Sequence, residues 1–192
     1  MYLKGNKELE VLGLYLRNYA QQLYLREISR LAKLPLKNTQ NVLNTLEKER
    51  ILRSSLKGKN KYFSLNLNNI QTKLLLLQAE VYKTYLFLET YNAFRTYLKA
   101  VSTQSLQVIF GSFARFTAEK DSDADLLVIS KDEEKLPLHL LPYKVHMIKL
   151  TEDSFRKATE KQEALIKEIE ENHVILNNHS FYVNTMWDYY GK

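Results

Sequence analysis

The sequence predicts an α+β protein with two domains joined by a helical segment. Three observations lead to this prediction. Apolar residues follow a helical period in the front of the chain, and two short alternating runs then flank a turn at Gly58. After residue 105, strand-like apolar runs alternate with helical segments. We place the domains at residues 1–66 and 106–192, with a connecting helical segment at 67–105.

The composition is that of an ordinary globular protein. The chain has 192 residues, which is enough for two domains of about 60–120 residues each. Hydrophobic residues make up 45% and charged residues 26%, which excludes a disordered or collagen-like chain. The absence of cysteine excludes disulfides, zinc–thiolate sites and iron–sulfur clusters.

The net charge of +6 is unevenly distributed. Residues 1–66 hold thirteen basic and five acidic side chains, whereas residues 106–192 hold eleven basic and fifteen acidic ones. A basic front suits a polyanion such as nucleic acid, and an acidic back can supply carboxylates for a metal ion. Chance and solubility are the alternative explanation of the asymmetry.

The N-terminus shows no targeting signal, because it lacks a basic stretch followed by an apolar run and a cleavage site. The most apolar run, residues 74–77, is far too short to span a bilayer. We expect a cytoplasmic protein without a membrane partner.

In the front domain we predict helices over residues 7–20, 26–33 and 36–49, and then a basic hairpin over 51–65. The third helix turns an apolar face inward, which consists of Thr39, Val42, Leu43 and Leu46.

Three helices followed by such a hairpin resemble the winged helix-turn-helix domain of prokaryotic transcription regulators, although Arg50 stands where such domains usually place a glycine. The resemblance implies binding to double-stranded DNA. Asn and Gln on the third helix can read adenine edges, and hairpin lysines can meet phosphates. The expected DNA-binding residues are Lys37, Gln40, Asn41, Asn44, Lys57, Lys59 and Lys61. A protein contact or a merely solvated surface are the alternatives.

The connecting segment contains no Gly or Pro between residues 70 and 100 and reads as one long helix or two shorter ones. Apolar residues occupy much of its circumference, so this surface must pack against other parts of the protein or against a partner. The segment either packs against both domains or forms a homodimer interface.

The back domain carries the most informative motif. A buried strand over residues 108–110 runs into Gly111 and Ser112, where a glycine backbone, a hydroxyl and a helix start favour phosphate. Asp123 and Asp125 lie two residues apart, so on an extended chain they point to the same side. A hard cation such as Mg²⁺ is the natural ion between two carboxylates.

The run Gly-Ser-x-Ala-Arg from Gly111, with Ser-Asp-Ala-Asp-Leu-Leu-Val from Ser122, resembles the minimal nucleotidyltransferases of the DNA polymerase β-like superfamily. The chain is similar in particular to archaeal proteins that fuse a winged helix to this domain. The resemblance implies that Gly111 and Ser112 hold the phosphates of an NTP, most naturally ATP. It also implies that Asp123 and Asp125 bind Mg²⁺ or Mn²⁺. For Arg115, a phosphate contact and a structural ion pair are equally open.

Two positions depart from that pattern. Phe116 replaces the glycine that usually follows the arginine, and its bulk is expected to narrow the approach to the phosphates. The third carboxylate is missing from the next predicted strand, residues 143–150, where His146 is the nearest polar candidate. His146 can accept a proton or bind a softer ion, or can be an ordinary strand residue. Glu152 and Asp153, just beyond that strand, are the alternative source of a third acid.

We therefore expect an enzyme that transfers a nucleoside monophosphate from an NTP to a protein or nucleic-acid hydroxyl. Family members include antitoxins that modify a toxin partner, so a protein acceptor fits the resemblance. The alternative is a DNA-binding regulator whose back domain has lost catalysis and senses nucleotide or mediates dimerisation.

Overall fold

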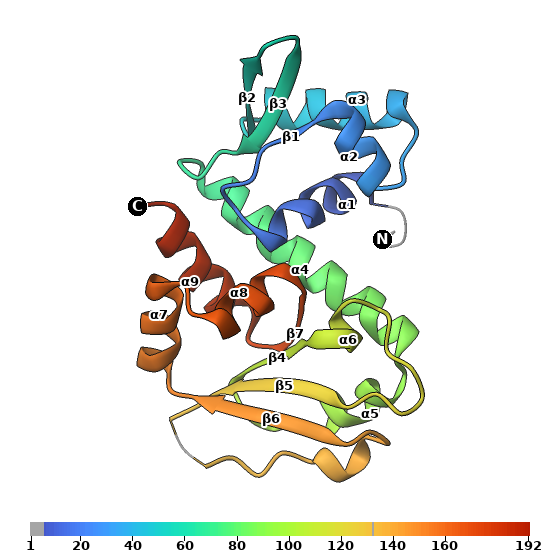
Figure 1. Cartoon of the computed structure of the whole chain (residues 1–192), viewed down its shortest axis with the longest axis vertical. Helices are drawn as coiled ribbons and strands as arrows, with labels where there is room; N and C mark the ends of the chain where they lie inside the picture. Colours follow the sequence, from blue (N-terminus) through green and yellow to red (C-terminus); the bar gives the residue numbers. More distant parts are fainter. Residues whose placement is uncertain (1–5, 132) are drawn as a thin grey trace. The chain divides into compact units, whose positions relative to one another are not determined.

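The computed structural model describes residues 6–131 and 133–192, so residues 1–5 of the first expected domain lie outside the described residues. The chain folds into two compact units (Figure 1). Unit 1 comprises the described residues up to Tyr82 together with Met186–Lys192, and unit 2 comprises Lys83–Thr185. The units therefore divide the chain within helix α4 (Ile70–Thr90) and within helix α9 (His179–Tyr190). The domain boundaries expected at residues 66 and 105 stay predictions.

Unit 1 contains three helices and a small antiparallel sheet, followed by the first part of α4. Its elements are α1 (Lys7–Gly13), η1 (Leu14–Arg17), β1 (Leu23–Tyr24), α2 (Leu25–Leu31), α3 (Leu36–Lys48), β2 (Leu52–Lys57) and β3 (Asn60–Leu65). The strand order is β1-β3-β2. The helix expected over 7–20 is shorter than predicted, because its second half tightens into the 3₁₀ turn η1. The Asn6 side chain caps α1 by accepting from the amides of Glu8 and Leu9.

Helix α3 is amphipathic in the predicted sense. The inward face is confirmed, since Thr39, Val42, Leu43 and Leu46 are all buried. The hairpin is confirmed as well. Strands β2 and β3 pair in register from Leu52 opposite Leu65, and Gly58 supplies the positive φ of +60° that the turn needs. Phe63 anchors the hairpin in the core of unit 1, where its carbonyl accepts a 3.0 Å hydrogen bond from the Tyr15 hydroxyl.

Unit 2 contains a four-stranded mixed sheet with helices around it. After α4 follow α5 (Ala93–Ala100), β4 (Leu106–Phe110), α6 (Gly111–Ala114), β5 (Ala124–Ile129), η2 (Leu138–Leu140), β6 (Val145–Leu150), α7 (Glu152–Lys161), α8 (Ala164–Glu171), β7 (His173–Asn177) and α9. The strand order is β6-β5-β4-β7, with β5 and β6 parallel and the other neighbours antiparallel. The α+β class is confirmed at this level.

The connecting segment forms two helices, which is one of its two expected forms, because the chain turns between Thr90 and Ala93. After β6 the chain forms two further helices, α7 and α8. They are separated at Gln162, whose backbone is left-handed with a φ of 51°.

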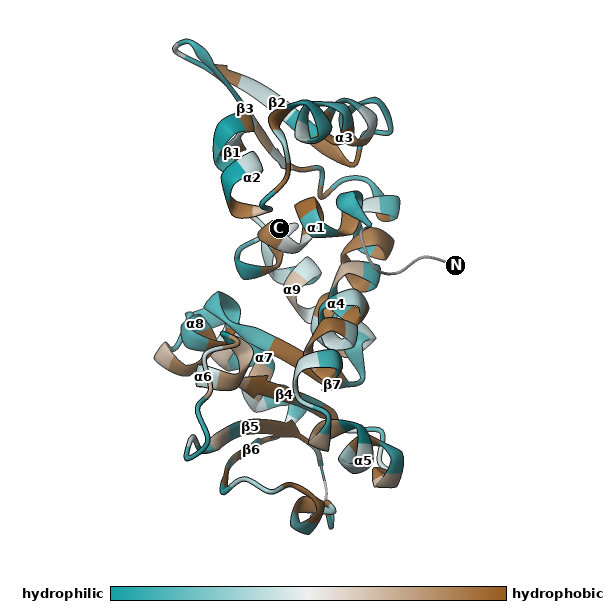
Figure 2. Cartoon of the chain, turned by 90° about the vertical axis from the view of Figure 1, so that its right-hand side faces the viewer, coloured by the Kyte–Doolittle hydropathy of each residue, from teal (hydrophilic) through white to brown (hydrophobic). Residues whose placement is uncertain are grey.

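The core of unit 2 lies against the sheet, and Figure 2 shows the hydrophobic colour concentrated on β4 and β5. Strand residues Ile109, Leu126 and Val128 share one cluster with the rings of Phe87 and Phe94 from α4 and α5. The neighbouring strand residues, which alternate to the other face, are also fully buried: Val108, Leu127 and Ile175. Both faces of the sheet are therefore covered. No helix in the described part of the chain is long and apolar enough to cross a bilayer.

Several helices end on a left-handed residue that is not glycine. After α3, the amide of Arg50 donates to the carbonyl of Glu47 at 3.0 Å, and that of Ile51 to Leu46 at 2.8 Å. This is the Schellman arrangement, which normally places glycine at the left-handed position. The same pair of hydrogen bonds surrounds the left-handed residues that follow α2, α6 and α7, namely Lys33, Phe116 and Gln162. Two of these four, Arg50 and Phe116, are the residues that stand where the resemblances led us to expect glycine.

This geometry makes Arg50→Gly a stabilising substitution. Arg50 is exposed and has a φ of 59°, which costs a residue with a Cβ about 1–2 kcal/mol. Glycine avoids that cost but gives the unfolded chain more freedom, so we expect a net gain of about 0.5–1 kcal/mol in the free energy of unfolding. Chemical denaturation measures it, with Arg50→Ala as the control that keeps the strained backbone. A loss of stability in the glycine variant would contradict the strain argument.

Candidate functional site

The candidate site begins where β4 meets β5. Phe110, the last residue of β4, pairs with Asp125 in the ladder, and Gly111 then opens α6 with a φ of +69°. A Cβ at Gly111 would lie 2.3 Å from Asp125 Oδ2, so either the carboxylate or the backbone would have to shift. Glycine allows both the left-handed turn and this close approach of α6 to the Asp125 carboxylate.

The parallel edge strand β6 and the residue before it bring two basic side chains to the aspartates. His146 is the ladder partner of Asp125, and its Nδ1 lies 3.5 Å from Asp125 Oδ1. One alternation earlier, Lys144 Nζ lies 3.1 Å from Asp123 Oδ2. The Lys144 and His146 side chains are 82% and 67% exposed, so both pairs are open to solvent and readily exchanged for a ligand.

Lys144 was not among the residues that we expected at the site. The spacing pointed to it, since Lys-x-His before and in β6 repeats the spacing of Asp-x-Asp before and in β5. Parallel strands in register place such pairs side by side. The register itself is a long-range property that the local pattern did not reveal.

The oxygen ligands at this site meet only part of the requirement of a hard cation. Within residues 6–131 and 133–192, no group of three or more His, Asp or Glu side chains is arranged to hold a metal ion. Two carboxylates remain, the exposed Asp123 and the half-buried Asp125. Mg²⁺ in nucleotide sites is commonly held by one or two carboxylates plus the phosphates and water. The residues therefore fit a magnesium or manganese ion that arrives with a nucleotide.

Glu152 and Asp153 are excluded as the third acid of this site. They open α7, which follows the last residue of β6, whereas His146 lies at the beginning of that strand. Leu150 lies four residue steps after His146 along the strand, at about 3.3 Å per step. Glu152 instead lines a small hollow with Ser105 and Ser130, at the opposite ends of β4 and β5.

Helix α6 carries the remaining candidates. Ser112 is half-buried, and within the described part of the chain its hydroxyl makes no hydrogen bond. Arg115 is exposed and forms no ion pair with any described residue, so the structural ion pair considered for it is not found. Phe116 is 40% exposed and its ring packs against those of Phe87 and Tyr91, with centroids 6.2 Å apart in both cases.

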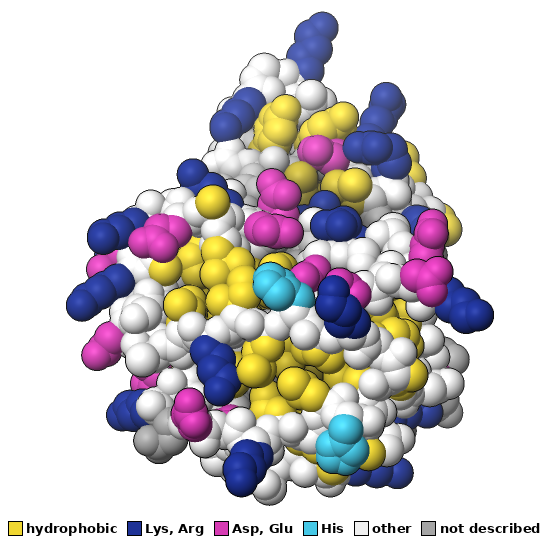
Figure 3. All heavy atoms as spheres, turned by 60° about the horizontal axis from the view of Figure 1, so that its bottom comes forward, with side chains coloured by type: hydrophobic (Ala, Val, Ile, Leu, Met, Phe, Trp, Pro, Cys, Tyr) yellow, Lys and Arg dark blue, Asp and Glu magenta, His cyan; other side chains and the backbone are white. Residues whose placement is uncertain are grey.

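Figure 3 views the molecule with the bottom of Figure 1 brought forward, where β6 forms an edge of the sheet. Hydrophobic side chains stay visible there among basic and acidic ones, and a histidine lies between two hydrophobic patches with charged side chains beside it. The surface around this edge strand is therefore mixed in character.

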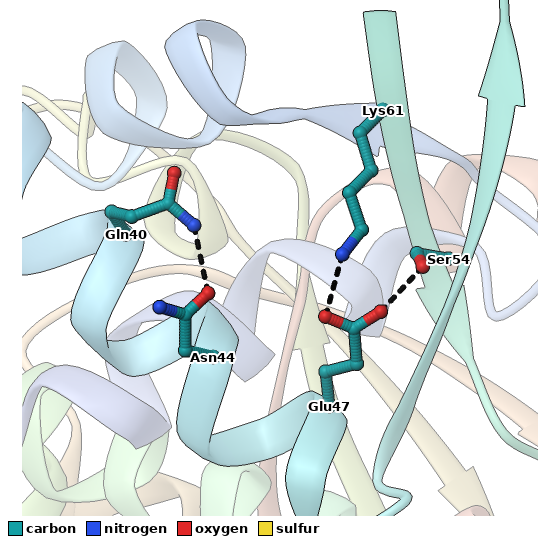
Figure 4. A network of polar contacts seen from close by, with 5 residues as sticks. All are labelled: Gln40, Asn44, Glu47, Ser54 and Lys61. Carbon is teal, nitrogen blue, oxygen red and sulfur yellow. Dashed lines mark hydrogen bonds and ion pairs between the residues drawn. The ribbon is translucent and has the colours of Figure 1, made fainter.

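The DNA-binding candidates lie in unit 1, and several of them already have partners (Figure 4). On α3, Gln40 Nε2 donates to Asn44 Oδ1 at 2.8 Å. One turn further along α3, Glu47 accepts hydrogen bonds from Lys61 Nζ on β3 at 2.7 Å and from the Ser54 hydroxyl on β2. These bonds from Lys61 and Ser54 lower the pKa of Glu47. The contact ties both hairpin strands to α3.

The other DNA-binding candidates differ in the contacts that their side chains make. Lys37 and Asn41 are exposed on α3. On the hairpin, the Lys57 ammonium lies 5.6 Å from the centre of the Tyr62 ring. Lys59 is exposed at the tip and has no ion pair or ring contact with the described residues.

Residues 92–179 match the family model for the nucleotidyltransferase domain. Comparisons with curated proteins and with solved structures give no match. The matched segment contains β4–β7 and every candidate of the nucleotide site, from Gly111 to His146. It supports assignment of this segment to the nucleotidyltransferase superfamily and, with that, a general function in nucleoside monophosphate transfer.

The contact between Gly111 and Asp125 can be measured by a double-mutant cycle. Gly111→Ala adds a Cβ that collides with the carboxylate, and we expect it to lower the free energy of unfolding by about 2 kcal/mol or more. In an Asp125→Ala background the collision is removed, so the loss should shrink to the cost of the left-handed backbone.

Gly58→Ala is the matched control, because Gly58 is also left-handed, with a φ of +60°, and a Cβ there meets nothing within 4 Å. Equal losses for Gly111→Ala with and without Asp125 would show that the carboxylate does not impose the glycine.

Proposed function

We propose that the protein is a metal-dependent nucleotidyltransferase that moves a nucleoside monophosphate from an NTP to a hydroxyl group of a protein or nucleic acid, with pyrophosphate as the leaving group. The observation that carries this proposal is the close approach of the Gly111 backbone to the Asp125 carboxylate at the end of β4. It places a glycine turn, which accommodates phosphates, directly beside a carboxylate that can hold their counter-ion. The family match of residues 92–179 supports the reaction class.

Each residue has a role in this proposal. Gly111 and Ser112 hold the phosphates of the NTP, with ATP as the first candidate, and Ser112 contributes a hydroxyl without another partner in the described chain. Asp123 and Asp125 would hold Mg²⁺ or Mn²⁺, which neutralises charge on the phosphates during transfer. Arg115 is free to approach a phosphate. His146 orients the Asp125 carboxylate and is the candidate to hold a proton beside it.

Transfer activity should depend on both aspartates. With labelled ATP and Mg²⁺ or Mn²⁺, we expect label to pass from the nucleotide to an acceptor in a cell extract. The double variant Asp123→Asn/Asp125→Asn should reduce this transfer at least a hundredfold, because it removes both negative charges from the expected cation site. Asp121→Asn is the control, since it removes an exposed carboxylate from the loop that precedes β5. Transfer that survives the double variant would overturn the proposed site.

A second function is favoured by a specific observation. Both aspartates are paired with basic side chains, Lys144 and His146, and the described chain contains no three-ligand group around them. This arrangement suits a DNA-binding regulator whose unit 2 has weak or no catalysis and senses a nucleotide or mediates dimerisation. Nucleotide binding without transfer of label would favour this second function over the first.

For unit 1 we propose a winged helix-turn-helix that binds double-stranded DNA. The order of three helices and a hairpin supports it, as does the polar outer surface of α3 with Lys37, Gln40 and Asn41. A homodimer is proposed through α4, which exposes large apolar side chains on unit 1 at Ile70 and Leu74. A protein acceptor such as a toxin partner stays a proposal that follows from the resemblance.

DNA binding by unit 1 should be sensitive to salt and to the hairpin lysines. Replacing Lys57, Lys59 and Lys61 together by Ala removes three cations, so a gel-shift titration should show weaker binding to every duplex sequence. The control replaces three exposed lysines of unit 2, Lys157, Lys161 and Lys167, and keeps the same net charge. Equal affinity of both triple variants would contradict a role of the hairpin.

A further inference from the structure

A groove of about 520 Å³ lies in unit 1 between the hairpin and the helices α2 and α3. Its lining combines the start of α2, the middle of α3 and the hairpin tip, and consists of Tyr24, Leu25, Arg26, Gln40, Lys59, Asn60, Lys61 and Phe63. The volume falls in the range of about 300–1,000 Å³ that is typical of small-ligand sites. It therefore suits a narrow segment of a molecule rather than a helix or a sheet edge.

The lining is basic and contains no carboxylate. Arg26 and Lys59 are exposed and carry full positive charges from two different elements, while Gln40 and Asn60 add neutral donors. Phe63 and Tyr24 give the groove an apolar part. Alternating phosphate and sugar groups have the matching chemistry, because phosphates seek cations and the sugars tolerate apolar contact.

Lys61 differs from the other two cations of the groove. Its ammonium is held by Glu47 at 2.7 Å and lies 5.2 Å from the centre of the Phe63 ring. Ser54 fixes the second oxygen of the same carboxylate. Glu47 thus lies just behind the lining and offsets the charge of Lys61, which leaves Arg26 and Lys59 as the cations available to a ligand.

We propose that this groove seats the phosphodiester backbone of one strand of double-stranded DNA, with Arg26 and Lys59 each contacting a phosphate and Glu47 restraining Lys61. The inference rests on the proposed DNA binding of unit 1 and adds to it a residue outside the hairpin and α3. Arg26 begins the helix before α3, so the strand would be contacted from both sides of the groove. Glu47 then limits affinity, since its negative charge neutralises a cation that would otherwise meet phosphate.

The experiment measures the binding of a fluorescent duplex by the full chain through anisotropy, over a series of salt concentrations. Arg26→Ala and Lys59→Ala should each reduce the slope of log K against log salt by about 0.9, which corresponds to one phosphate contact. Glu47→Gln keeps a partner for Ser54 but releases Lys61, so it should bind several-fold more tightly with a steeper slope. Lys157→Ala on α7 removes the same charge far from unit 1 in the sequence and should leave the slope unchanged.

The possible results distinguish failure of the groove assignment from failure of the proposed DNA binding by unit 1. No binding of duplex by the wild-type chain at low salt would overturn DNA binding itself. Binding with an unaltered slope in both Arg26→Ala and Lys59→Ala, or weaker binding in Glu47→Gln, would overturn the groove and leave DNA binding standing. Displacement of the duplex by millimolar ATP, with ATP binding lost in Arg26→Ala, would make the groove a mononucleotide site and overturn the strand assignment.

Discussion

The contact between the Gly111 backbone and the Asp125 carboxylate is the constraint on which the nucleotide site depends. Because Gly111 has no Cβ, β4 can turn into α6 directly beside the start of β5. That turn places Ser112 directly after the end of β4, whose last residue pairs with Asp125. Asp125 in turn pairs with His146 of β6. A larger residue at position 111 would have to displace the Asp125 carboxylate or shift the backbone of this turn.

In both units, charged or basic side chains of the candidate sites are paired with groups of opposite character. On the sheet edge Asp123 and Asp125 are paired with Lys144 and His146, and on the hairpin Lys61 is paired with Glu47. All of these pairs are solvent-exposed, so each contributes little to stability and a stronger ligand can replace it. The net charge of +6 therefore conceals charges that are neutralised in pairs, and the groups without partners, such as Lys59, are the ones most available to a ligand.

Local pattern predicted much of the fold. The buried face of α3, the turn at Gly58 and the order of strand, glycine turn and strand around Gly111 all follow from spacing and residue type. The left-handed conformations of Arg50 and Phe116 could not be predicted, because paired hydrogen bonds at the helix ends impose them on residues that do not favour them. The ion pair of Lys144 depends on the register of β5 and β6, which is set by the packing of the whole sheet rather than by the neighbouring residues.

The most direct test of the nucleotide site is a crystal structure of the full chain with a non-hydrolysable ATP analogue and Mg²⁺. Our account predicts the triphosphate at the backbone of Gly111 and Ser112, with the cation on Asp123 and Asp125 and with Lys144 displaced from its carboxylate. A nucleotide bound elsewhere, or both aspartates still paired with Lys144 and His146 at saturating analogue, would contradict it.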